Sequence, residues 1–380
     1  MRTYLGSNTC DNPRFIQLGG KLKNSKLVAI LAATTVASAL VLSGCSSSDT
    51  ADSASSTATK ACLALDTGGV DDKSFNAASW AGAEAAAALD ENVTVSYLPA
   101  ASGAEYAPNI KKFVDQDCNL IIGVGFAIAG AIIASAKENP TINYAVVDDA
   151  GLEPNADFTE FTAIPNVKGL TFKTQESSFL AGYAAAAYSA KGTVATYGGA
   201  PYPTVTAFMD GFAQGVNYYN TAKGKSVKVL GWDRAAKNGE FVGDFANTSK
   251  ALQISKNFEQ AGADVIFPVA GGLGGSTAQN SMDGGKSVTI WVDTDGVVSA
   301  EKYRSVLLTS VMKGLGESVQ AAIAEVAAGT FTNTAYVGTL ANKGTRLAPF
   351  HDFEGKIPST LAAELADVEA KIVSGEIVVE

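Results

Sequence analysis

The residues best suited to bind a small molecule lie in the segment Asp66–Trp80, which reads DTGGVDDKSFNAASW. A short apolar run, Cys62–Leu65, precedes it and an alanine-rich helical pattern follows it, so we expect a strand, a turn and a helix. Parallel α/β sheets bind their ligands at the carboxyl ends of strands, where such a turn lies. Phe75 and Asn76 would then face a crevice, unless the segment forms only a turn, a helix cap and one core phenylalanine.

Acidic and aromatic residues near other predicted strand ends could complete a binding site. A carboxylate accepts hydrogen bonds from hydroxyl or ring N–H groups, and Lys313 could add a donor. Aromatic faces offer flat apolar contact to a heteroaromatic ring or to a sugar. Each aromatic taken alone could equally be a core residue, and the acids could be solvated turn residues or ligands of a hard cation. The acidic candidates are Asp66, Asp148 and Asp293, and the aromatic candidates are Phe75, Phe126, Trp232 and Phe245.

A glycine-rich loop beginning at Gly271, with the sequence GGLGGS, follows a predicted strand and opens a predicted helix. It lacks the G-x-G-x-x-G spacing of a dinucleotide site and the lysine of a phosphate-binding loop. The loop could present backbone N–H groups to a ligand or could simply form a tight turn.

Residues for catalysis and metal binding are scarce. The only histidine is His351, far from any motif, so no Ser–His–Asp or Cys–His set can be assembled. Cysteine and histidine spacings typical of metal sites are absent from the sequence. We therefore expect a protein that is not an enzyme and that uses no cofactor or metal.

Length and composition favour a globular protein of two domains. The chain has 380 residues, of which 47% are hydrophobic and 17% are charged. A chain of this length is longer than a domain with one ordinary hydrophobic core. The formal charge is −10, and because the part before Cys45 is basic, the remainder carries about −14. Such an acidic body repels phosphate backbones, so nucleic acid is not an expected partner.

The first 45 residues have the layout of a secretory signal. Lysines between Lys21 and Lys26 precede an apolar run, Leu27–Leu42, which is short for a membrane span. The closing sequence LSGC resembles a bacterial lipobox, which implies cleavage before Cys45 and lipidation of its thiol; an uncleaved anchor is the alternative. Residues 46–59 are rich in Ser, Ala, Thr and Asp and are expected to form a flexible tether.

Two cysteines remain after the signal. Cys62 and Cys118 each open an apolar run interpreted as a strand, and an extracytoplasmic location permits a disulfide. If the two strands are neighbours, the thiols lie at the same edge of a sheet and can pair; two buried free thiols are the alternative.

Beyond the tether, short apolar runs alternate with helical patterns in two successive series. This alternation predicts an α/β protein with two doubly wound parallel sheets that face each other across a cleft. We expect the strands at 62–65, 93–98, 120–124, 143–147, 169–172, 193–197, 226–230, 264–269, 288–292 and 305–311, with short strands near 335–340 and 377–379. We expect the helices at 74–89, 106–116, 127–137, 176–189, 203–220, 248–261, 275–283, 313–328 and 359–374.

Several segments of the chain resemble the basic membrane lipoprotein family, the purine-nucleoside-receptor-like substrate-binding lipoproteins of ABC importers. The resemblance extends over most of the chain after the tether. It rests on DTGGVDDKSFNAASWAG at Asp66, NLIIGVGFAIAGAI at Asn119, the AVVDD strand end, FLAGYAAAAYS at Phe179, GGAPYPTVTAFMDGFAQGV at Gly198, GADVIFPVAGG at Gly262, WVDTDG at Trp291 and LLTSVMKGLGESV at Leu307.

The resemblance implies a type I periplasmic-binding fold, with two Rossmann-like lobes joined by three crossover segments. The expected boundaries place residues 60–168 and about 294–332 in the first lobe, and 169–293 with about 333–380 in the second.

The resemblance also implies a nucleoside between the lobes. Phe75 and Phe245 would stack on the base, and Asp293 and Lys313 would contact the ribose. The remaining residues implied at the site are Asp66 and Asn76 as partners of the base, and Asp148, Gly125, Phe126 and Gly271 in the lining.

Two departures from the family pattern affect the expected ligand. The family usually has G-S-F-x-D around the second stacking residue, whereas residues 243–247 here read GDFAN, and Gly314 follows Lys313 where Arg is common. The ligand could therefore differ from a purine nucleoside.

We expect a monomeric, lipid-anchored protein on the extracytoplasmic face of the cell membrane that captures a nucleoside and delivers it to an ABC permease. The alternatives are a receptor for a sugar or another small solute, a surface enzyme acting on nucleosides or glycosides, and a signalling or adhesion lipoprotein.

Overall fold

The computed structural model describes residues 58–380. The predicted signal peptide, the predicted lipidation site Cys45 and almost all of the predicted tether lie outside these residues. The first strand already begins at Thr59, so the folded part starts at the end of the segment assigned to the tether.

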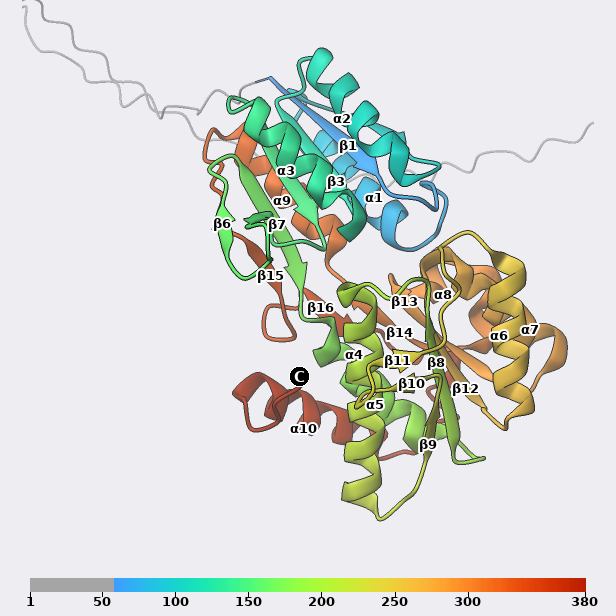
Figure 1. The fold of residues 1–380 in the computed structure, drawn as a ribbon. Helices are drawn as coiled ribbons and strands as arrows, with labels where there is room; N and C mark the ends of the chain where they lie inside the picture. The colour runs from blue at the N-terminus through green and yellow to red at the C-terminus, as the bar shows by residue number, and fades with distance from the viewer. Residues whose placement is uncertain (1–57) are drawn as a thin grey trace, which may run out of the picture. The chain divides into compact units, whose positions relative to one another are not determined.

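The first lobe is built on a six-stranded parallel sheet with the order β15-β7-β4-β3-β1-β2. Helices α1 and α9 cover one face of this sheet, and α2 and α3 cover the other (Figure 1). The strands are β1 (Thr59–Leu65), β2 (Val93–Pro99), β3 (Leu120–Val124), β4 (Asn143–Val147), β7 (Val167–Phe172) and β15 (Tyr336–Gly338), and the helices are α1 (Phe75–Leu89), α2 (Tyr106–Asp115), α3 (Ala129–Glu138) and α9 (Leu315–Ala327).

The second lobe is built on a sheet with the order β16-β14-β13-β12-β8-β9, parallel except for β16. Helices α4, α5 and α10 cover one face, and α6 and α7 cover the other. The strands are β8 (Thr193–Gly198), β9 (Lys228–Leu230), β12 (Val265–Val269), β13 (Val288–Asp293), β14 (Leu307–Lys313) and β16 (Thr345–Leu347), and the helices are α4 (Thr174–Tyr188), α5 (Pro203–Lys223), α6 (Thr248–Gln260), α7 (Gly274–Gly284), α8 (Gly296–Ser299) and α10 (Leu361–Ser374).

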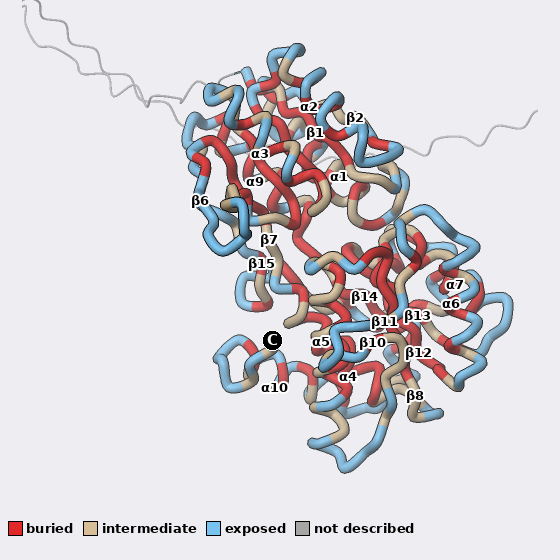
Figure 2. The backbone as a smooth tube through the Cα atoms, viewed as in Figure 1, coloured by how far each residue is buried: buried red, intermediate tan, exposed pale blue. Residues whose placement is uncertain are grey.

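The central strands of both sheets are buried on both faces, and the exposed residues gather in outer helices, edge strands and loops (Figure 2). This pattern is typical of sheets covered by helices on both sides, whose strands read as continuous apolar runs. The runs LIIGV in β3 and VIFPV in β12 are of this kind and are buried throughout, which is why the sequence located them correctly.

The predicted lobe boundaries were wrong for three strands. One is β15, placed by the prediction in the second lobe from about residue 333 onward, which pairs with β7 of the first sheet. β7, placed by the prediction in the second lobe from residue 169 onward, pairs with β4 and β15 of the first sheet. β14, placed in the first lobe, pairs with β13 of the second sheet. Successive parallel strands joined by a crossover tend to be neighbours, so the chain changes lobe after these strands rather than before them. It crosses at residues 172–174, 313–315 and 338–345.

Smaller elements account for the remaining differences from prediction. Residues 377–379, predicted as a strand, form none. Two hairpins that no periodicity indicated are present, because two- and three-residue strands carry too short a pattern to detect. The hairpins are β5 (Leu152–Pro154) with β6 (Phe161–Ala163) and β10 (Trp232–Asp233) with β11 (Asn238–Gly239), and the 3₁₀ helices are η1 (Gly103–Glu105), η2 (Phe126–Ile128), η3 (Gly271–Leu273), η4 (Glu301–Val306) and η5 (His351–Phe353).

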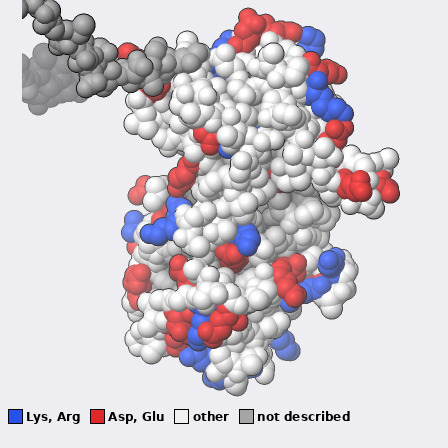
Figure 3. Space-filling view, turned by 90° about the vertical axis from the view of Figure 1, so that its left-hand side faces the viewer, with Lys and Arg blue, Asp and Glu red and all other residues white. Residues whose placement is uncertain are grey.

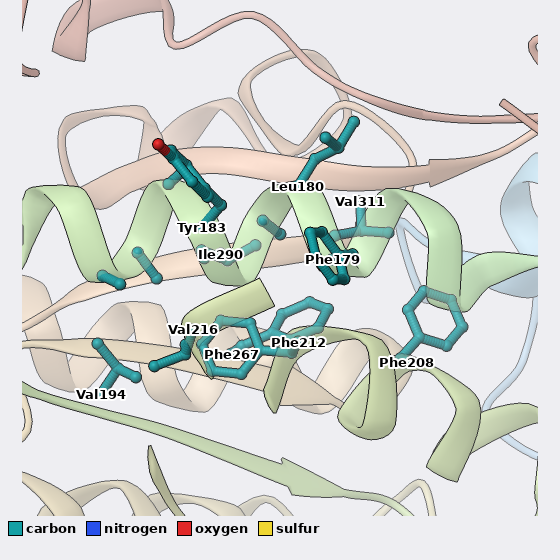
Figure 4. Packing of buried hydrophobic residues seen from close by; sticks show 14 of the residues in the cluster. Phe179, Leu180, Tyr183, Val194, Phe208, Phe212, Val216, Phe267, Ile290 and Val311 are labelled. Atoms are coloured by element: carbon teal, nitrogen blue, oxygen red, sulfur yellow. The ribbon is translucent and has the colours of Figure 1, made fainter. Parts of the chain in front are cut away.

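Helices α4 and α5 pack closely in the core of the second lobe (Figure 4). A Cβ added to Gly182 would lie 2.0 Å from the carbonyl oxygen of Phe212, and one added to Gly215 would lie 1.9 Å from that of Phe179. Only glycine permits this approach of the two backbones. The close approach holds α4 against α5 immediately after the first crossover.

Cys62 and Cys118 form a disulfide, with 6.2 Å between their Cα atoms. This outcome decides between the two alternatives that the sequence left open. β1 and β3 are adjacent, and Cys62 pairs with Ile121 in the sheet register, which brings Cys118, just before β3, alongside it.

Candidate functional site

The ten residues predicted to contact a ligand all line one cavity of about 350 Å³. Its wall is formed by loops at the carboxyl ends of strands from both sheets, as expected for parallel α/β lobes. The predicted residues in the lining are Asp66, Phe75, Asn76, Gly125, Phe126, Asp148, Phe245, Gly271, Asp293 and Lys313. The fourth aromatic candidate, Trp232, is not in the lining; it packs beside Phe241, and its Nε1 donates to Asp210.

The loop before α1 is held by Asp72. Its Oδ1 accepts from the backbone N–H groups of Ser74 and Ala77, both at 3.0 Å, and its Oδ2 accepts from that of Asn76 at 2.8 Å. Asp72 therefore satisfies the free N–H groups at the start of the helix. Burial raises the pKa of this carboxyl, against the lowering effect of the three N–H groups. The cap fixes where Phe75 and Asn76 stand at the cavity.

The side chain of Ser74 is hydrogen-bonded to the facing lobe instead of capping the helix. Its side chain makes no cap hydrogen bond; the hydroxyl lies 2.6 Å from Oδ2 of Asp293 and 3.2 Å from the carbonyl oxygen of Val292. Thr294 also donates to the carbonyl oxygen of Lys73, at 3.0 Å. The 66–76 loop of the first lobe is thus hydrogen-bonded directly to the end of β13.

Asp293 is held in an environment that disfavours its charge. The residue is only 6% exposed, and burial raises the pKa of its carboxyl to about 6 although Lys313 and the Ser74 hydroxyl lower it. Its backbone φ of +68° is in the left-handed region, which non-glycine residues seldom occupy. Asp148, at the end of β4, has a φ of +66°. Unusual backbone conformations of this kind are concentrated at functional sites.

Lys313, the last residue of β14, carries the only ammonium group in the cavity lining. Its Nζ lies 2.7 and 2.6 Å from the two oxygens of Asp148, so the second lobe is bonded to the first. The rings of Phe75, Phe172 and Phe208 lie around the ammonium, with centroids 4.9, 5.5 and 5.3 Å from Nζ. Aromatic faces and a carboxylate both attract an ammonium group.

Aromatic rings also line the opposite part of the cavity. Tyr202, which precedes α5, lies 5.6 Å from Phe126 of the first lobe and 6.1 Å from Phe245 of the second, measured between ring centroids. The rings are tilted, at 41° and 33°. Phe75 and Phe245, the pair predicted to stack on a base, border the same cavity from different lobes.

The electrostatics of the cavity are acidic. Four carboxyl groups and one ammonium group line it. An anionic ligand such as a phosphate ester would therefore meet net repulsion at short range in a partly desolvated site. The cavity suits a neutral ligand that combines flat apolar faces with hydroxyl or N–H donors. On the face drawn in Figure 3, acidic and basic residues are interspersed without a continuous basic patch.

Several residues of the site could not be predicted from the sequence. Tyr202 and Phe208 line the cavity but lie in α5 or at its start, where an aromatic residue is expected to belong to the core. Ser74 has no local signal for its role, because its bond to Asp293 joins residues 219 positions apart. Within residues 58–380 no cluster of three metal-ligating side chains occurs, and no helix there reaches the length and apolarity needed to cross a membrane.

Known proteins resemble this chain along most of its length. A relative from Listeria innocua, named CD4+ T-cell-stimulating antigen, is 29% identical over 369 residues, which covers 92% of this chain and 97% of that protein. The ABC transporter nucleoside-binding protein BmpA of Lactococcus lactis is 30% identical over 254 residues, 66% of each chain. Basic membrane protein D of Borreliella burgdorferi is 30% identical over 285 residues, 72% of this chain and 76% of that protein.

Solved structures share the fold. A solute-binding protein of an ABC transporter system from Aeropyrum pernix superposes with a TM-score of 0.73 at 23% identity, covering 85% of this chain and 94% of that one. A periplasmic solute-binding protein from Actinobacillus succinogenes with bound D-allose gives a TM-score of 0.56 at 14% identity, with 78% and 99% covered. These neighbours show the type I periplasmic-binding fold, as expected.

The family model for ABC transporter substrate-binding proteins of the PnrA-like type matches residues 59–380, the whole of the two lobes. Members of this family bind a solute for a transporter and are not enzymes. Two lobes that share an acidic, aromatic cavity fit that role. This chain belongs to the family of PnrA-like ABC transporter substrate-binding proteins.

Proposed function

We propose that the protein is a lipid-anchored receptor that binds a purine nucleoside between its lobes and delivers it to the permease of an ABC importer. The observation that carries the proposal is one cavity in which aromatic rings from both lobes stand beside buried carboxylates. Aromatic rings match the two faces of a nucleobase, and carboxylates accept from ribose hydroxyls and ring N–H groups. A volume of about 350 Å³ suits a ligand of this size.

The placement of the aromatic and polar groups supports specific roles. Phe75 and Phe245 would stack on the base, and Asp66 and Asn76 would accept from its edge. Asp293, beside Lys313, would accept from the ribose. Asp148, Gly125, Phe126 and Gly271 would complete the wall. The name of the Lactococcus lactis relative, a nucleoside-binding protein, is in keeping with this assignment.

Closure of the lobes would accompany binding, because ligand contacts come from both sides and therefore stabilise the closed form. The receptor would act as a monomer. Its attachment to the extracytoplasmic face of the membrane would depend on Cys45, which lies outside the described residues. Mass spectrometry of the mature amino terminus would test that attachment, since an unmodified chain that retains residues 1–44 would contradict it.

A sugar is the second candidate ligand, because a structural neighbour with the same fold holds D-allose. A thermal-shift panel separates the two, since a ligand that binds the folded protein raises the melting temperature by mass action, and more so when it binds more tightly. We expect stabilisation by inosine, guanosine or adenosine, and none by ribose, galactose or adenosine monophosphate. Stabilisation by a hexose alone would establish the second candidate, and stabilisation by no small solute would favour a signalling or adhesion role.

Calorimetry on two site variants tests the assignment directly. Phe75→Ala and Asp293→Ala should each weaken nucleoside binding at least tenfold, about 1.4 kcal/mol. Phe161→Ala is the matched control, because that side chain is 56% exposed on the β5–β6 hairpin and outside the cavity. Wild-type affinity in both site variants would reject the proposed site.

A further inference from the structure

Asp66 has one oxygen fixed by the protein and one left for a ligand. Oδ1 of Asp66 accepts from the backbone N–H of Thr67 at 2.6 Å and also from the hydroxyl of Tyr106. None of the hydrogen bonds among residues 58–380 ends on Oδ2. This oxygen lies against Gly125, where a Cβ would come within 2.6 Å of it. The glycine thus leaves the space that Oδ2 occupies at the cavity wall.

Tyr106 is well placed to keep Asp66 in this orientation. It is the first residue of α2 and is only 8% exposed, packed in the core under the sheet with Ile110 and Phe113 of the same helix. Burial, together with the bond to Asp66, raises the pKa of the Tyr106 hydroxyl, so the hydroxyl keeps its proton at neutral pH and can only donate to the carboxylate. Tyr106 does not line the cavity.

A second acceptor stands near the same edge. The side chain of Asn76 lines the cavity and donates its Nδ2 to the carbonyl oxygen of Thr67 at 3.4 Å. Its Oδ1 is buried and has no hydrogen-bond partner among the described residues. Buried acceptors are normally paired, and an ionised carboxylate can only accept. Oδ2 of Asp66 is therefore the open acceptor at this end of the cavity, beside a buried and unpaired one, and it calls for a ligand with an N–H donor.

We propose that Tyr106 is a positioning residue for ligand recognition: it holds Oδ1 of Asp66 so that Oδ2 accepts an N–H from the base, and the cavity thereby selects nucleobases that carry a donor on the edge away from the sugar. The inference rests on the proposed nucleoside function. It assigns a role to a residue that touches no ligand and makes a donor-bearing edge, such as N1–H of a 6-oxopurine, the basis of selection.

Calorimetry with three closely related ligands tests the inference. Inosine has N1–H, whereas 1-methylinosine and purine riboside lack any donor on that edge. The wild-type protein should bind inosine at least tenfold more tightly than the other two. Tyr106→Phe should weaken inosine binding at least fivefold and change purine riboside binding less than twofold. Tyr97→Phe is the matched control, since this half-buried tyrosine packs edge-to-face against Trp80 and does not line the cavity. It should change the affinity for neither ligand.

A second variant tests the anchoring without removing Tyr106. In Asp66→Asn, the hydroxyl of Tyr106 and the N–H of Thr67 would both hold the amide oxygen, so Nδ2 would face the ligand. The preference should then invert, with purine riboside, whose N1 is an acceptor, bound more tightly than inosine. A side chain free to rotate would satisfy either ligand and give no inversion.

The outcomes separate the inference from the function on which it rests. Equal wild-type affinity for inosine and purine riboside, equal losses for both ligands in Tyr106→Phe, or an unchanged preference in Asp66→Asn would each overturn the inference while leaving nucleoside binding intact. Binding of no nucleoside by the wild-type protein would overturn the proposed function and the inference together.

Discussion

Replacing Asp293 by asparagine should stabilise the ligand-free protein at neutral pH. Burial raises the pKa of this carboxyl from 3.8 to about 6, so the folded protein is destabilised whenever Asp293 is ionised. At 1.36 kcal/mol for each pKa unit, the cost is roughly 3 kcal/mol. The asparagine amide is neutral and its oxygen can still accept from Ser74, whose hydroxyl lies 2.6 Å from Oδ2 of the aspartate.

The sign of the pH dependence follows from the two ionisations. The carboxyl of the unfolded chain loses its proton near pH 4, and that of the folded chain near pH 6. Below about pH 4 both forms are protonated and the carboxyl carries no penalty. The penalty grows as pH rises through this window and is constant above it. The free energy of unfolding of the variant should therefore exceed that of the wild type by roughly 3 kcal/mol at pH 7.5 and by about 1.5 kcal/mol at pH 5.

Urea unfolding of both proteins without ligand, at pH 7.5 and pH 5, measures the difference. Asp115→Asn is the control, because Asp115 is exposed on α2 and pairs only with Lys111; its effect should stay within about 0.5 kcal/mol at both pH values. A variant less stable than the wild type at pH 7.5 would mean that attraction to Lys313 outweighs desolvation. An equal difference at the two pH values would mean that Asp293 does not titrate in this window. Either result would refute the reasoning.

Two further predictions concern the buried charges and the disulfide. Lys313→Met should destabilise the protein by about 3–5 kcal/mol at pH 7.5, because it leaves Asp148 buried without its partner beside Asp293; urea unfolding that shows no loss would contradict this role. The double change Cys62→Ala with Cys118→Ala should lower the free energy of unfolding by about 2–4 kcal/mol, since the bridge closes a loop between residues 56 apart. The urea midpoint of this variant should match that of the wild type in reductant. A midpoint equal to that of the untreated wild type would contradict the prediction.

Stability gained by Asp293→Asn and affinity lost by Asp293→Ala would have the same physical origin. A carboxylate held in a poorly solvated site can accept from ligand hydroxyls in addition to the bond that Ser74 donates to Oδ2, and its desolvation weakens the free protein. The left-handed backbone at Asp293 adds a conformational cost at the same position. The lobes therefore carry a local instability that ligand hydrogen bonds can offset.

The order of the elements could be read from the sequence because each signal was local. Continuous apolar runs such as those of β3 and β12 are buried on both faces of covered sheets and need no partner to be recognised. The loop before α1 was found for a related reason: glycines, acids and one phenylalanine after a strand predict a ligand-binding turn whatever the rest of the fold. Because parallel sheets bring strand ends to one edge, the predicted residues lie around one cavity.

Tertiary structure alone decided which sheet each strand joins and what each side chain meets. β7 and β14 have apolar runs that suit either lobe, and only hydrogen bonding to β4 and β13 places them. The bonds of Ser74 to Asp293 and of Tyr106 to Asp66 join residues 219 and 40 positions apart. No local pattern encodes such contacts, because they depend on how elements distant in the sequence pack together. Residue types at strand ends therefore predicted which residues border the cavity, whereas the charge state and orientation of these groups arise from packing between distant segments.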